Sequence, residues 1–306
     1  MGTPLVSIIT PCYNSGRFVH VLLDSVLAQD YPAAEMWVID DGSTDDTRQV
    51  VESYKPLFIE KGYTLEYVWQ EHSGQSEAIN KGLKLISGDY LVWPDSDDYY
   101  ATSDALSLMV AELEKSGDKV GMVRCLPSYV DANGIDYDGY RHANFDKEDL
   151  FEDCLFGING FWYMSGGYMA KTSFIDKYIP QRTISTAKNA GQNWQLMLPL
   201  LYGHKCLTIK KYLYKIVVRD DSHSRLGYRT YTERKRKYID FEHVLVQTLE
   251  RMNHLPYDKK RKYIKIVRRN YRKEHLKLWL KTHVRTWRIR CMINKVKQLV
   301  NDKAGK

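Results

Sequence analysis

Three carboxylates stand almost side by side in the segment WPDSDDYY, at Asp95, Asp97 and Asp98. They follow Tyr90–Trp93, a short apolar run that predicts a buried strand. Carboxylates that face one point without a cation repel one another, whereas Mg²⁺ and Mn²⁺ prefer hard oxygen ligands. The pattern therefore favours a divalent metal that bridges the phosphates of a nucleotide. The residues also allow a solvated acidic loop that caps the next helix.

Two more polar clusters follow predicted strands. Pro11–Asn14 comes after LVSIIT at 5–10, and Asp40–Asp46 comes after MWVI at 36–39. In open α/β sheets the ligand lies beyond the carboxyl ends of the strands. We therefore expect the three clusters to belong to one site.

The elements that must position these clusters alternate between strand and helix over the first hundred residues. This alternation predicts βαβ units and a parallel sheet. The later section, Ala101–Arg229, is less regular. The expected strands lie at 5–10, 36–39, 65–69, 90–93, 120–125, 206–210 and 213–218, and the expected helices at 17–29, 76–86, 105–115 and 193–202. One more helix is expected after Ser43 or Thr44, either of which can cap it, with acidic residues in its first turn.

The net charge of +7 hides two parts of opposite sign. Residues 230–306 hold 23 Lys and Arg against 7 Asp and Glu, which leaves 22 basic and 31 acidic residues in 1–229. The patterning also becomes purely helical at about residue 229, so we expect a domain boundary there. Five scattered cysteines without a CxxC pair argue against zinc and a disulfide framework, and favour a reducing cytoplasm. We find no signal peptide and no apolar run long enough to span a bilayer.

The segments SIITPCYNSGRFV, VIDDGSTDDT and NKGLKLISGDYLVWPDSDDYY, in this order and spacing, resemble the family 2 glycosyltransferases with the GT-A fold. The resemblance implies a Rossmann-like mixed central sheet flanked by helices over 1–229, with a nucleotide-sugar-binding half at 1–100 and an acceptor half at 101–229. A basic helical extension, 230–306, follows. The family resemblance also implies inverting transfer of one sugar from a nucleotide sugar, most often a UDP-sugar, with Mn²⁺ or Mg²⁺.

The resemblance assigns roles by position. Pro11 and Tyr13 would line the nucleoside pocket, with Tyr13 stacked on the base. Asp41 would accept a hydrogen bond from the base edge, and Asp40 would support that loop. Asp97 would be the favoured metal ligand, and Asp98 would lie close to the donor sugar. The full set of expected donor-binding residues is Pro11, Tyr13, Asn14, Asp40, Asp41, Ser73, Gly74, Gln75, Asn80, Asp95, Ser96, Asp97, Arg219 and Arg225, and that of expected metal ligands is Asp95, Asp97 and His223.

The segment HSGQSEAIN, 72–80, matches the family's loop over the nucleotide and sugar. Ser73, Gly74 and Gln75 would approach phosphate or sugar hydroxyls, and Asn80 would tie the following helix to the acidic loop. The alternative is a helix N-cap at Ser76, with Asn80 on the helix surface. Both interpretations stay open.

The catalytic base is not identified by the sequence. The family commonly carries a carboxylate pair at the start of a helix in the acceptor half, where this chain has Gln192 and Asn193. Amides can hydrogen-bond an acceptor but cannot take its proton. Three kinds of base remain possible: another carboxylate, Asp98 or Asp153; a histidine, His204 or His223; or an oxygen of the substrate itself. Asn193 stays a candidate catalytic-site residue because of its position at the start of this helix.

The segment RDDSHSR, 219–225, resembles the family's late segment that folds over the diphosphate. His223 would complete the metal's coordination or contact phosphate, although a lone histidine is often structural. Arg219 or Arg225 would neutralise charge on the leaving diphosphate.

An acceptor platform is expected from aromatic residues of the Gly-rich segment 157–167, namely Phe161, Trp162 and Tyr163, together with Gln192 and Trp194. Aromatic faces stack on the apolar faces of sugar rings. Core packing is the alternative, and we prefer it for at least one of the three adjacent aromatics.

The basic tail repeats apolar residues at three- and four-residue spacing from Leu276 to Cys291. This pattern suits an anionic membrane surface, which would bring the site to a lipid-linked acceptor on the inner face of the cell membrane. It equally suits packing on the catalytic domain or on a second subunit. Nucleic-acid binding is disfavoured because no known motif supports it and residues 1–229 are acidic.

The resemblance also suggests a setting, the synthesis of a bacterial capsule, O-antigen or related surface polysaccharide. The departure at Gln192 and Asn193 leaves another possibility, a catalytically weak partner of an active homologue.

Overall fold

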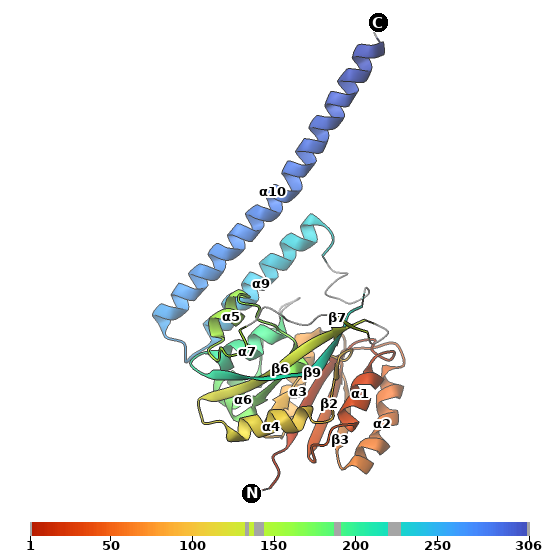
Figure 1. Ribbon diagram of the computed structural model, residues 1–306, viewed down its shortest axis with the longest axis vertical. Helices are drawn as coiled ribbons and strands as arrows, with labels where there is room; N and C mark the ends of the chain where they lie inside the picture. Colours follow the sequence, from red (N-terminus) through yellow and green to blue (C-terminus); the bar gives the residue numbers. More distant parts are fainter. Residues whose placement is uncertain (1, 132–134, 138–143, 187–190, 220–227, 305–306) are drawn as a thin grey trace.

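The computed structural model describes residues 2–131, 135–137, 144–186, 191–219 and 228–304, and for Tyr137 and 285–304 it describes the backbone alone. Its centre is a nine-stranded mixed sheet with helices on both faces (Figure 1). The strand order is β3-β2-β1-β4-β8-β6-β9-β5, and β7 pairs with β6 off this path.

The first hundred residues form the parallel part of the sheet, as predicted. β1 pairs in parallel with β2 and β4, and β2 pairs in parallel with β3. The elements are β1 (Val6–Cys12), α1 (Val19–Leu27), β2 (Ala34–Asp40), α2 (Thr47–Lys61), β3 (Thr64–Trp69), α3 (Gln75–Leu85) and β4 (Tyr90–Val92).

The second part of the sheet is mixed. β8 lies between β4 and β6 and is antiparallel to both, whereas β6 and β9 are parallel. The mixed sheet implied by the family resemblance is therefore correct, and the parallel arrangement predicted from the alternation holds for the first hundred residues, for which it was made. The elements are β5 (Tyr99–Tyr100), α4 (Ala105–Lys115), β6 (Val120–Val130), β7 (Asp136–Tyr137), α5 (Phe151–Phe156), η1 (Ser165–Gly167), β8 (Tyr168–Lys171), α6 (Thr172–Tyr178), η2 (Pro180–Arg182), α7 (Gln192–Leu201) and β9 (Lys205–Val217).

The runs 206–210 and 213–218, predicted as two strands, form the single strand β9. Its register with β6 shifts near Leu126, where an irregularity lets one long strand bend. β9 thereby reaches the acidic loop, because its end pairs with β5 at Tyr99 and Tyr100.

Two hydrophobic cores cover the two faces of the sheet. Ile8 and Ile9 are adjacent in β1 and fully buried, yet they belong to different cores. Burial on both faces explains why β1 is a continuous apolar run instead of an alternating one. The sheet is thus a rigid platform whose loops carry the polar clusters.

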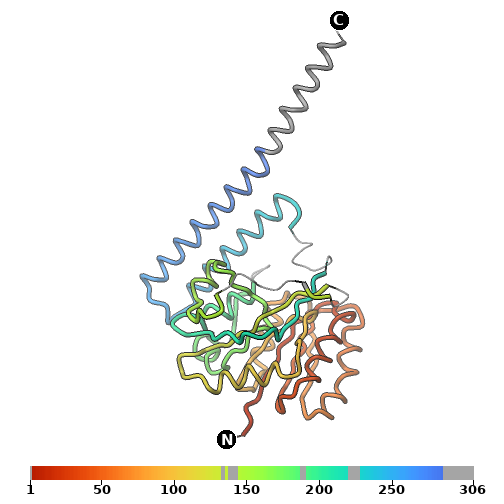
Figure 2. Tube along the Cα trace, viewed as in Figure 1, coloured from red at the N-terminus to blue at the C-terminus, as the bar shows by residue number. Residues whose placement is uncertain are grey.

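The C-terminal region consists of α9 (Tyr231–Arg251) and α10 (Tyr257–Ala304). Thr230 and Glu233 form a capping box at the start of α9. Leu245, Leu249 and Val267 belong to the core that also contains α7, so α9 and the first turns of α10 pack on the main body. Beyond these turns α10 packs along α9 as far as His283, whose ring lies 5.4 Å from that of Tyr231, and leads away from the sheet (Figures 1 and 2). In the part of the chain that the structure describes, no helix combines the length and apolar character that crossing a bilayer requires.

Candidate active site

The three polar clusters meet at the carboxyl ends of β1, β2 and β4. The backbone N–H of Asn14 donates to Ser43 Oγ (2.8 Å), and the N–H of Thr44 donates to Asn14 Oδ1 (2.9 Å). The hydroxyls of Ser15 and Ser96 are hydrogen-bonded at 2.9 Å. These bonds join the loop after β1 to the loop after β2 and to the acidic loop. The three loops therefore lie together, with Ser15 as a contact that the sequence analysis did not name, and their forming one functional site stays a prediction.

Asp40 supports the loop after β2, as predicted. Its Oδ1 accepts the N–H of Ser43 (2.8 Å), and its Oδ2 accepts the hydroxyl of Tyr67. Gly42 has φ +86°, and a Cβ there would lie 2.8 Å from the backbone nitrogen of His72. Only glycine lets this loop approach the segment after β3 so closely.

Asp41 is almost completely buried and holds the 72–74 segment. Its Oδ1 accepts from Gln70 Nε2 (2.7 Å) and from the N–H of Ser73 (2.8 Å). Its Oδ2 accepts the N–H of Gly74 (2.8 Å) and lies 3.0 Å from Nδ1 of His72. The carboxylate is thus engaged with the protein itself, and its role toward a base stays a prediction.

Tyr13 and His72 form an exposed aromatic pair at the same edge. The ring centroids are 4.5 Å apart, and 41% of Tyr13 is exposed. Pro11 is buried within β1, two residues before Tyr13. A flat ring such as a nucleobase can stack on the open face of Tyr13. His72 was not among the predicted site residues, although it directly precedes the predicted Ser73.

Asp95 and Asp98 are held by different parts of the chain. Gln75 Nε2 donates to Asp95 Oδ1 (3.0 Å), and Ser165 Oγ donates to Asp95 Oδ2 (3.2 Å). Asp98 is buried, and its Oδ1 accepts the N–H of Val217 at the end of β9 (2.9 Å). The acidic loop is therefore fixed by α3, η1 and β9 together.

Asp97 forms an ion pair with Arg219, which follows β9. The guanidinium carbon of Arg219 lies 3.7 Å from the centroid of the Phe18 ring. Arg219 was predicted as a residue that neutralises the diphosphate, and its pairing with Asp97 was not foreseen. His223 and Arg225 lie outside the described residues.

Burial, and next the neighbouring Asp97, raise the pKa of Asp95 to about 7. Burial, followed by Asp97 and Asp95, also raises the pKa of Asp98 well above its usual range. A divalent cation would offset this repulsion, and the oxygen-only donors suit Mg²⁺ or Mn²⁺. Among the residues that the structure describes, no group of three His, Cys, Asp or Glu converges on one metal position. That these carboxylates hold a divalent metal stays a prediction.

Asn80 is placed differently from the prediction. Its side chain is buried, its Nδ2 donates to the carbonyl of Ile184 (3.0 Å), and its Oδ1 accepts the N–H of Ile184 (2.8 Å). It ties α3 to the 184 segment and not to the acidic loop. Ser76 as the N-cap is also wrong, because α3 begins at Gln75 and Gly74 precedes it with φ +98°.

The Asn193 side chain is a structural bridge. Trp93 Nε1 donates to Asn193 Oδ1 (2.9 Å), and Asn193 Nδ2 donates to the carbonyl of Tyr163 (2.7 Å). Both ends of the amide are therefore used to hold the end of β4 beside the aromatic segment. Gln192 is buried at the start of α7.

Two other candidates for the base are engaged elsewhere. Asp153 is buried, and its Oδ1 accepts from Lys147 Nζ (2.7 Å) and Asn159 Nδ2 (2.9 Å). His204 Nε2 lies 3.0 Å from the hydroxyl of Tyr178. Of the candidate bases within the described residues, Asp98 alone belongs to the acidic loop.

Trp162 lies in the core and not on an acceptor platform. It is fully buried, with the guanidinium carbon of Arg124 3.7 Å from its ring, and Phe161 is 8% exposed. Core packing is therefore the correct alternative for Trp162. Tyr163 and Trp194 are half-buried, with ring centroids 5.4 Å apart, and form the accessible part of this aromatic group.

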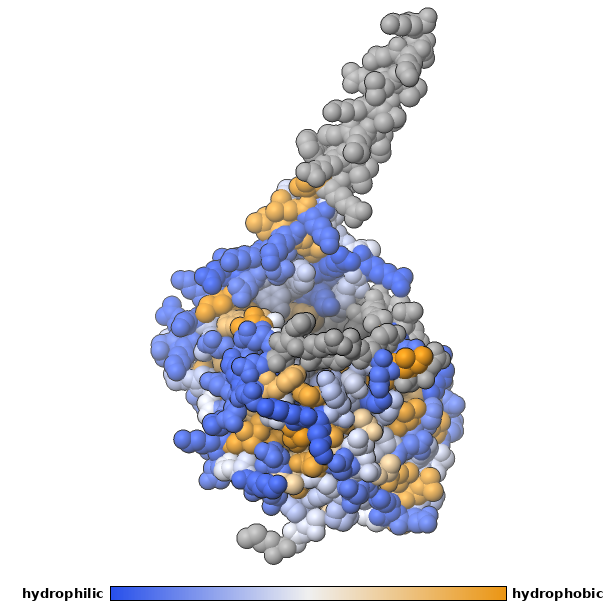
Figure 3. All heavy atoms as spheres, in the orientation of Figure 1, coloured by the Kyte–Doolittle hydropathy of each residue, from blue (hydrophilic) through white to orange (hydrophobic). Residues whose placement is uncertain are grey.

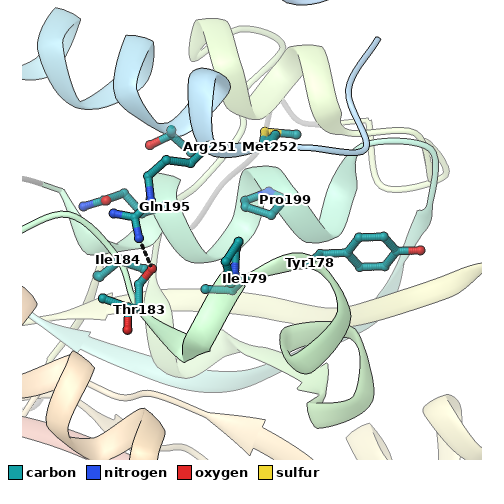
Figure 4. Close-up of a pocket in the computed structure, with 10 residues that line it drawn as sticks. Tyr178, Ile179, Thr183, Ile184, Gln195, Pro199, Arg251 and Met252 are labelled. Carbon is teal, nitrogen blue, oxygen red and sulfur yellow. Dashed lines mark hydrogen bonds between the residues drawn. The ribbon is translucent and has the colours of Figure 1, made fainter.

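Two hollows lie away from this site. The larger, about 400 Å³, is at the opposite end of β4 and is lined by Ser87–Tyr90 and Lys171–Ser173, among others. The smaller, about 20 Å³, lies between α6, α7 and the end of α9 (Figure 4). It has room for roughly one water. Arg251 crosses it and donates to the carbonyl of Thr183 (2.8 Å), which fastens α9 to the body.

Comparison with known proteins identifies the family. The model of glycosyl transferase family 2 matches residues 7–160, which contain the loops after β1 and β2 and the acidic loop. The chain belongs to glycosyl transferase family 2. Among curated relatives, the poly(ribitol-phosphate) beta-N-acetylglucosaminyltransferase TarS of Staphylococcus aureus is 39% identical over 180 residues, 57% of this chain and 29% of TarS. Glycosyltransferase GlyA of Streptococcus pneumoniae is 26% identical over 233 residues, 72% of this chain and 32% of GlyA. The chain thus spans about a third of the length of these curated relatives.

Solved structures of glycosyltransferases share the fold. Residues 1–349 of S. aureus TarS in complex with UDP-GlcNAc match with a TM-score of 0.62 and 19% identity, over 91% of this chain and 73% of that one. The mannosyltransferase PcManGT from Pyrobaculum calidifontis, in complex with GDP-Man and Mn²⁺, matches with a TM-score of 0.55 and 21% identity, over 82% and 64%. The predicted GT-A fold with a helical C-terminal region is confirmed.

Proposed function

We propose that this family 2 member transfers a single sugar from a UDP-sugar to a saccharide acceptor, with inversion, in the synthesis of a bacterial surface polysaccharide. The observation that carries the proposal is the hydrogen-bonded junction of the Tyr13 loop, the Asp41 loop and the acidic loop at the carboxyl edge of the sheet. The UDP-GlcNAc bound by TarS and the GDP-Man bound by PcManGT support a nucleotide-sugar donor.

In this proposal the exposed face of Tyr13 stacks on the nucleobase, beside His72. Asp41 shapes the pocket through the backbone of Ser73 and Gly74, which it holds. A contact between Asp41 and the base edge requires that one of its present donors move. Asn14, Asp40 and Ser96 keep the three loops together, and Gln75 orients Asp95.

Asp97 and Asp95 are the residues that would hold Mn²⁺ or Mg²⁺, with His223 as a further proposed ligand. The bound metal would withdraw negative charge from the leaving diphosphate. Arg219 and Arg225 are proposed to add positive charge to the same region. Each of these contacts is stronger for the departing diphosphate than for the intact donor, which is the condition for accelerating the transfer.

Asp98 is the base that the geometry supports best. A carboxylate whose pKa is raised is better matched to accepting the proton of a hydroxyl near neutral pH. In this proposal Asp98 lies close to the donor sugar, as the family resemblance implies, and the Val217 N–H fixes its orientation. Tyr163 and Trp194 would hold the acceptor sugar, and Asn193 would position them.

A donor screen tests the proposal. Purified protein with Mn²⁺ is incubated with UDP-, dTDP- and GDP-sugars, and release of nucleoside diphosphate is measured. Release is expected from one UDP-sugar and should vanish in Asp97→Ala, whereas Asp146→Ala, which removes an exposed carboxylate paired with Lys210, should keep it. Silence with every donor would contradict the proposal and favour the catalytically weak partner that Asn193 leaves open.

We further propose that the acceptor is lipid-linked and that α10 rests on the anionic inner face of the cell membrane. Four residues of α10 with large apolar side chains are between 41% and 58% exposed, namely Leu276, Trp279, Leu280 and Val284. Figure 3 shows apolar side chains gathered where α10 leaves the body, with hydrophilic ones around them. Lys273, Lys277 and Lys281 lie in the same stretch and would contact lipid phosphates.

Vesicle sedimentation tests this attachment. Vesicles with one third phosphatidylglycerol should bind the protein, and neutral phosphatidylcholine vesicles should bind it much less. Leu276→Ser combined with Leu280→Ser should reduce binding at least fivefold, because both side chains are exposed in the free protein. Unchanged vesicle binding, or dimerisation that the double substitution abolishes, would instead assign this surface to a second copy.

A further inference from the structure

A lysine in the first half of α9 lies between two aromatic rings. Lys237 Nζ is 4.1 Å from the centroid of the Tyr228 ring and 5.3 Å from that of the Phe241 ring, both within the range of a cation–π contact. Its side chain is partly buried, whereas Lys235 and Arg236 on the same helix are exposed. Packing therefore holds this ammonium group in one place.

The described part of the chain offers this ammonium group no carboxylate partner. None of the carboxylates that the structure describes forms an ion pair with Lys237, and burial lowers the pKa of its ammonium group. Arg236, the residue before it, does have such a partner, because its Nε lies 3.0 Å from Asp240 Oδ1. Burial disfavours a charged group that lacks a counter-charge. An anion from outside the protein would supply the counter-charge.

Phe241 joins this lysine to the aromatic residues proposed to hold the acceptor sugar. The ring centroid of Phe241 is 4.9 Å from that of Trp194, and the centroid of Trp194 is 5.4 Å from that of Tyr163. α9 packs on α7, the helix that carries Trp194 (Figure 1). The ammonium group of Lys237 therefore lies at one end of a row of three aromatic rings.

The other end of this row is tied to the acidic loop. Asn193 Nδ2 donates to the carbonyl of Tyr163, and Asn193 Oδ1 accepts from Trp93 at the end of β4. Ser165, two residues after Tyr163, donates to Asp95 Oδ2 (3.2 Å). An acceptor whose reacting hydroxyl lies at the acidic loop would therefore extend along the rings toward α9.

We infer that Lys237 binds an anionic group of the acceptor, so that the acceptor is a saccharide that carries a phosphate or a carboxylate. This inference rests on the proposed function. Tyr163, Trp194 and Phe241 would contact the apolar faces of sugar rings, and Lys237 would pair with the negative charge. The charge would lie away from the reacting hydroxyl, because Lys237 and the acidic loop are at opposite ends of the row.

Acetylation of the full chain by an amine-reactive ester tests the inference, and mass spectrometry measures the rate at each lysine. The probes are glucose 6-phosphate, methyl glucuronide and the neutral methyl glucoside, at matched ionic strength and without any donor. At least one charged sugar should slow the acetylation of Lys237 about three- to tenfold, since a nearby anion favours the protonated, unreactive amine. Methyl glucoside should slow it less than about twofold, and the exposed Lys235 should not respond to any probe.

Matched variants test the same contact in binding, with thermal melting to verify folding. Calorimetric titration gives the Kd of the charged sugar that protects Lys237. Lys237→Gln should weaken this binding about five- to twentyfold, because it removes a charge-assisted contact, and should leave the binding of methyl glucoside unchanged. Lys237→Arg keeps the charge and should restore most of the affinity. Lys235→Gln, which removes an exposed charge from the same helix, should change it less than about twofold.

The contrary outcomes are distinct. No protection by either charged sugar, or equal protection by charged and neutral sugars, would overturn the role of Lys237. Equal slowing at Lys235 would also overturn it, because the effect would then come from general electrostatics. Protection by UDP alone would assign Lys237 to the donor diphosphate and overturn it as well. None of these results affects the donor screen. Protection of Lys237 by a charged sugar, combined with silence in the donor screen, would overturn the proposed function and leave the saccharide site intact.

Discussion

Replacing Asp41 by Asn tests how the loop beside Tyr13 is held. Asp41 is 5% exposed at its side chain, and its two oxygens accept three hydrogen bonds and face His72. An amide keeps one oxygen and turns the other position into a donor. Whichever way it is placed, its NH₂ group faces the N–H of Ser73 or of Gly74. Asp41→Asn therefore loses at least one charge-assisted bond and sets two donors against each other.

The expected loss is about 2 to 3 kcal/mol, since a hydrogen bond to a charged group contributes about 1.5–3 kcal/mol and an unsatisfied buried donor costs about 1–3 kcal/mol. That energy corresponds to about 30- to 150-fold in the equilibrium between the held and the released loop. Hydrogen exchange of the Ser73 and Gly74 amides measures it without any substrate. Their exchange should accelerate by this factor in Asp41→Asn, whereas Gln70→Ala, which removes one donor and keeps the charge, should change it less than about fivefold. Exchange within threefold of the wild type would refute the assignment of Asp41 as the anchor of this loop.

Three further predictions concern stability. Gly166→Ala should destabilise the protein by about 1–3 kcal/mol in urea unfolding, because its Cβ would lie 2.2 Å from the buried Tyr214 ring, while Gly117→Ala, with open space around its Cβ, should be near neutral. Thr230→Ala should lower the free energy of unfolding by about 1 kcal/mol through loss of the capping box, and an unchanged value would contradict that role. Burial, followed by nearby positive charge, lowers the pKa of His254, so the unfolded chain binds a proton more readily. Stability should be level above about pH 6.5 and decrease as the pH falls below it, and His254→Gln should flatten this decrease.

The order and type of the first elements follow from local sequence. Every strand and helix predicted before residue 100 is present, with bounds that differ by a few residues. Apolar runs bounded by Pro and Asp define the strands, and three-residue periodicity defines the helices. Because the carboxyl ends of parallel strands share one edge, strand order alone brings Tyr13, Asp41 and Asp95–Asp98 together. The nucleotide-binding half of the family resemblance depends on these same segments.

The later half depends on contacts that local patterns do not contain. The strand β9 joins two predicted runs, because its pairing with β6 continues through an irregularity. Asn80 and Ile184 are 104 residues apart, and their mutual hydrogen bonds satisfy buried backbone groups that no neighbouring residue reaches. Trp162 and Trp194 look alike as aromatic candidates, and only the tertiary packing shows that Trp162 belongs to the core while Trp194 is half-buried.

Local sequence is enough to specify the carboxylates, the strands that carry them and the family to which the chain belongs, since these features are encoded within a few residues of one another. Tertiary packing sets what each carboxylate touches. Asp41 is bound by the 72–74 segment, Asp98 by the end of β9 and Asp97 by Arg219, and each partner comes from a distant part of the chain. The physical reason is that burial and charge compensation are properties of assembled surfaces, so they appear only when separate segments have packed.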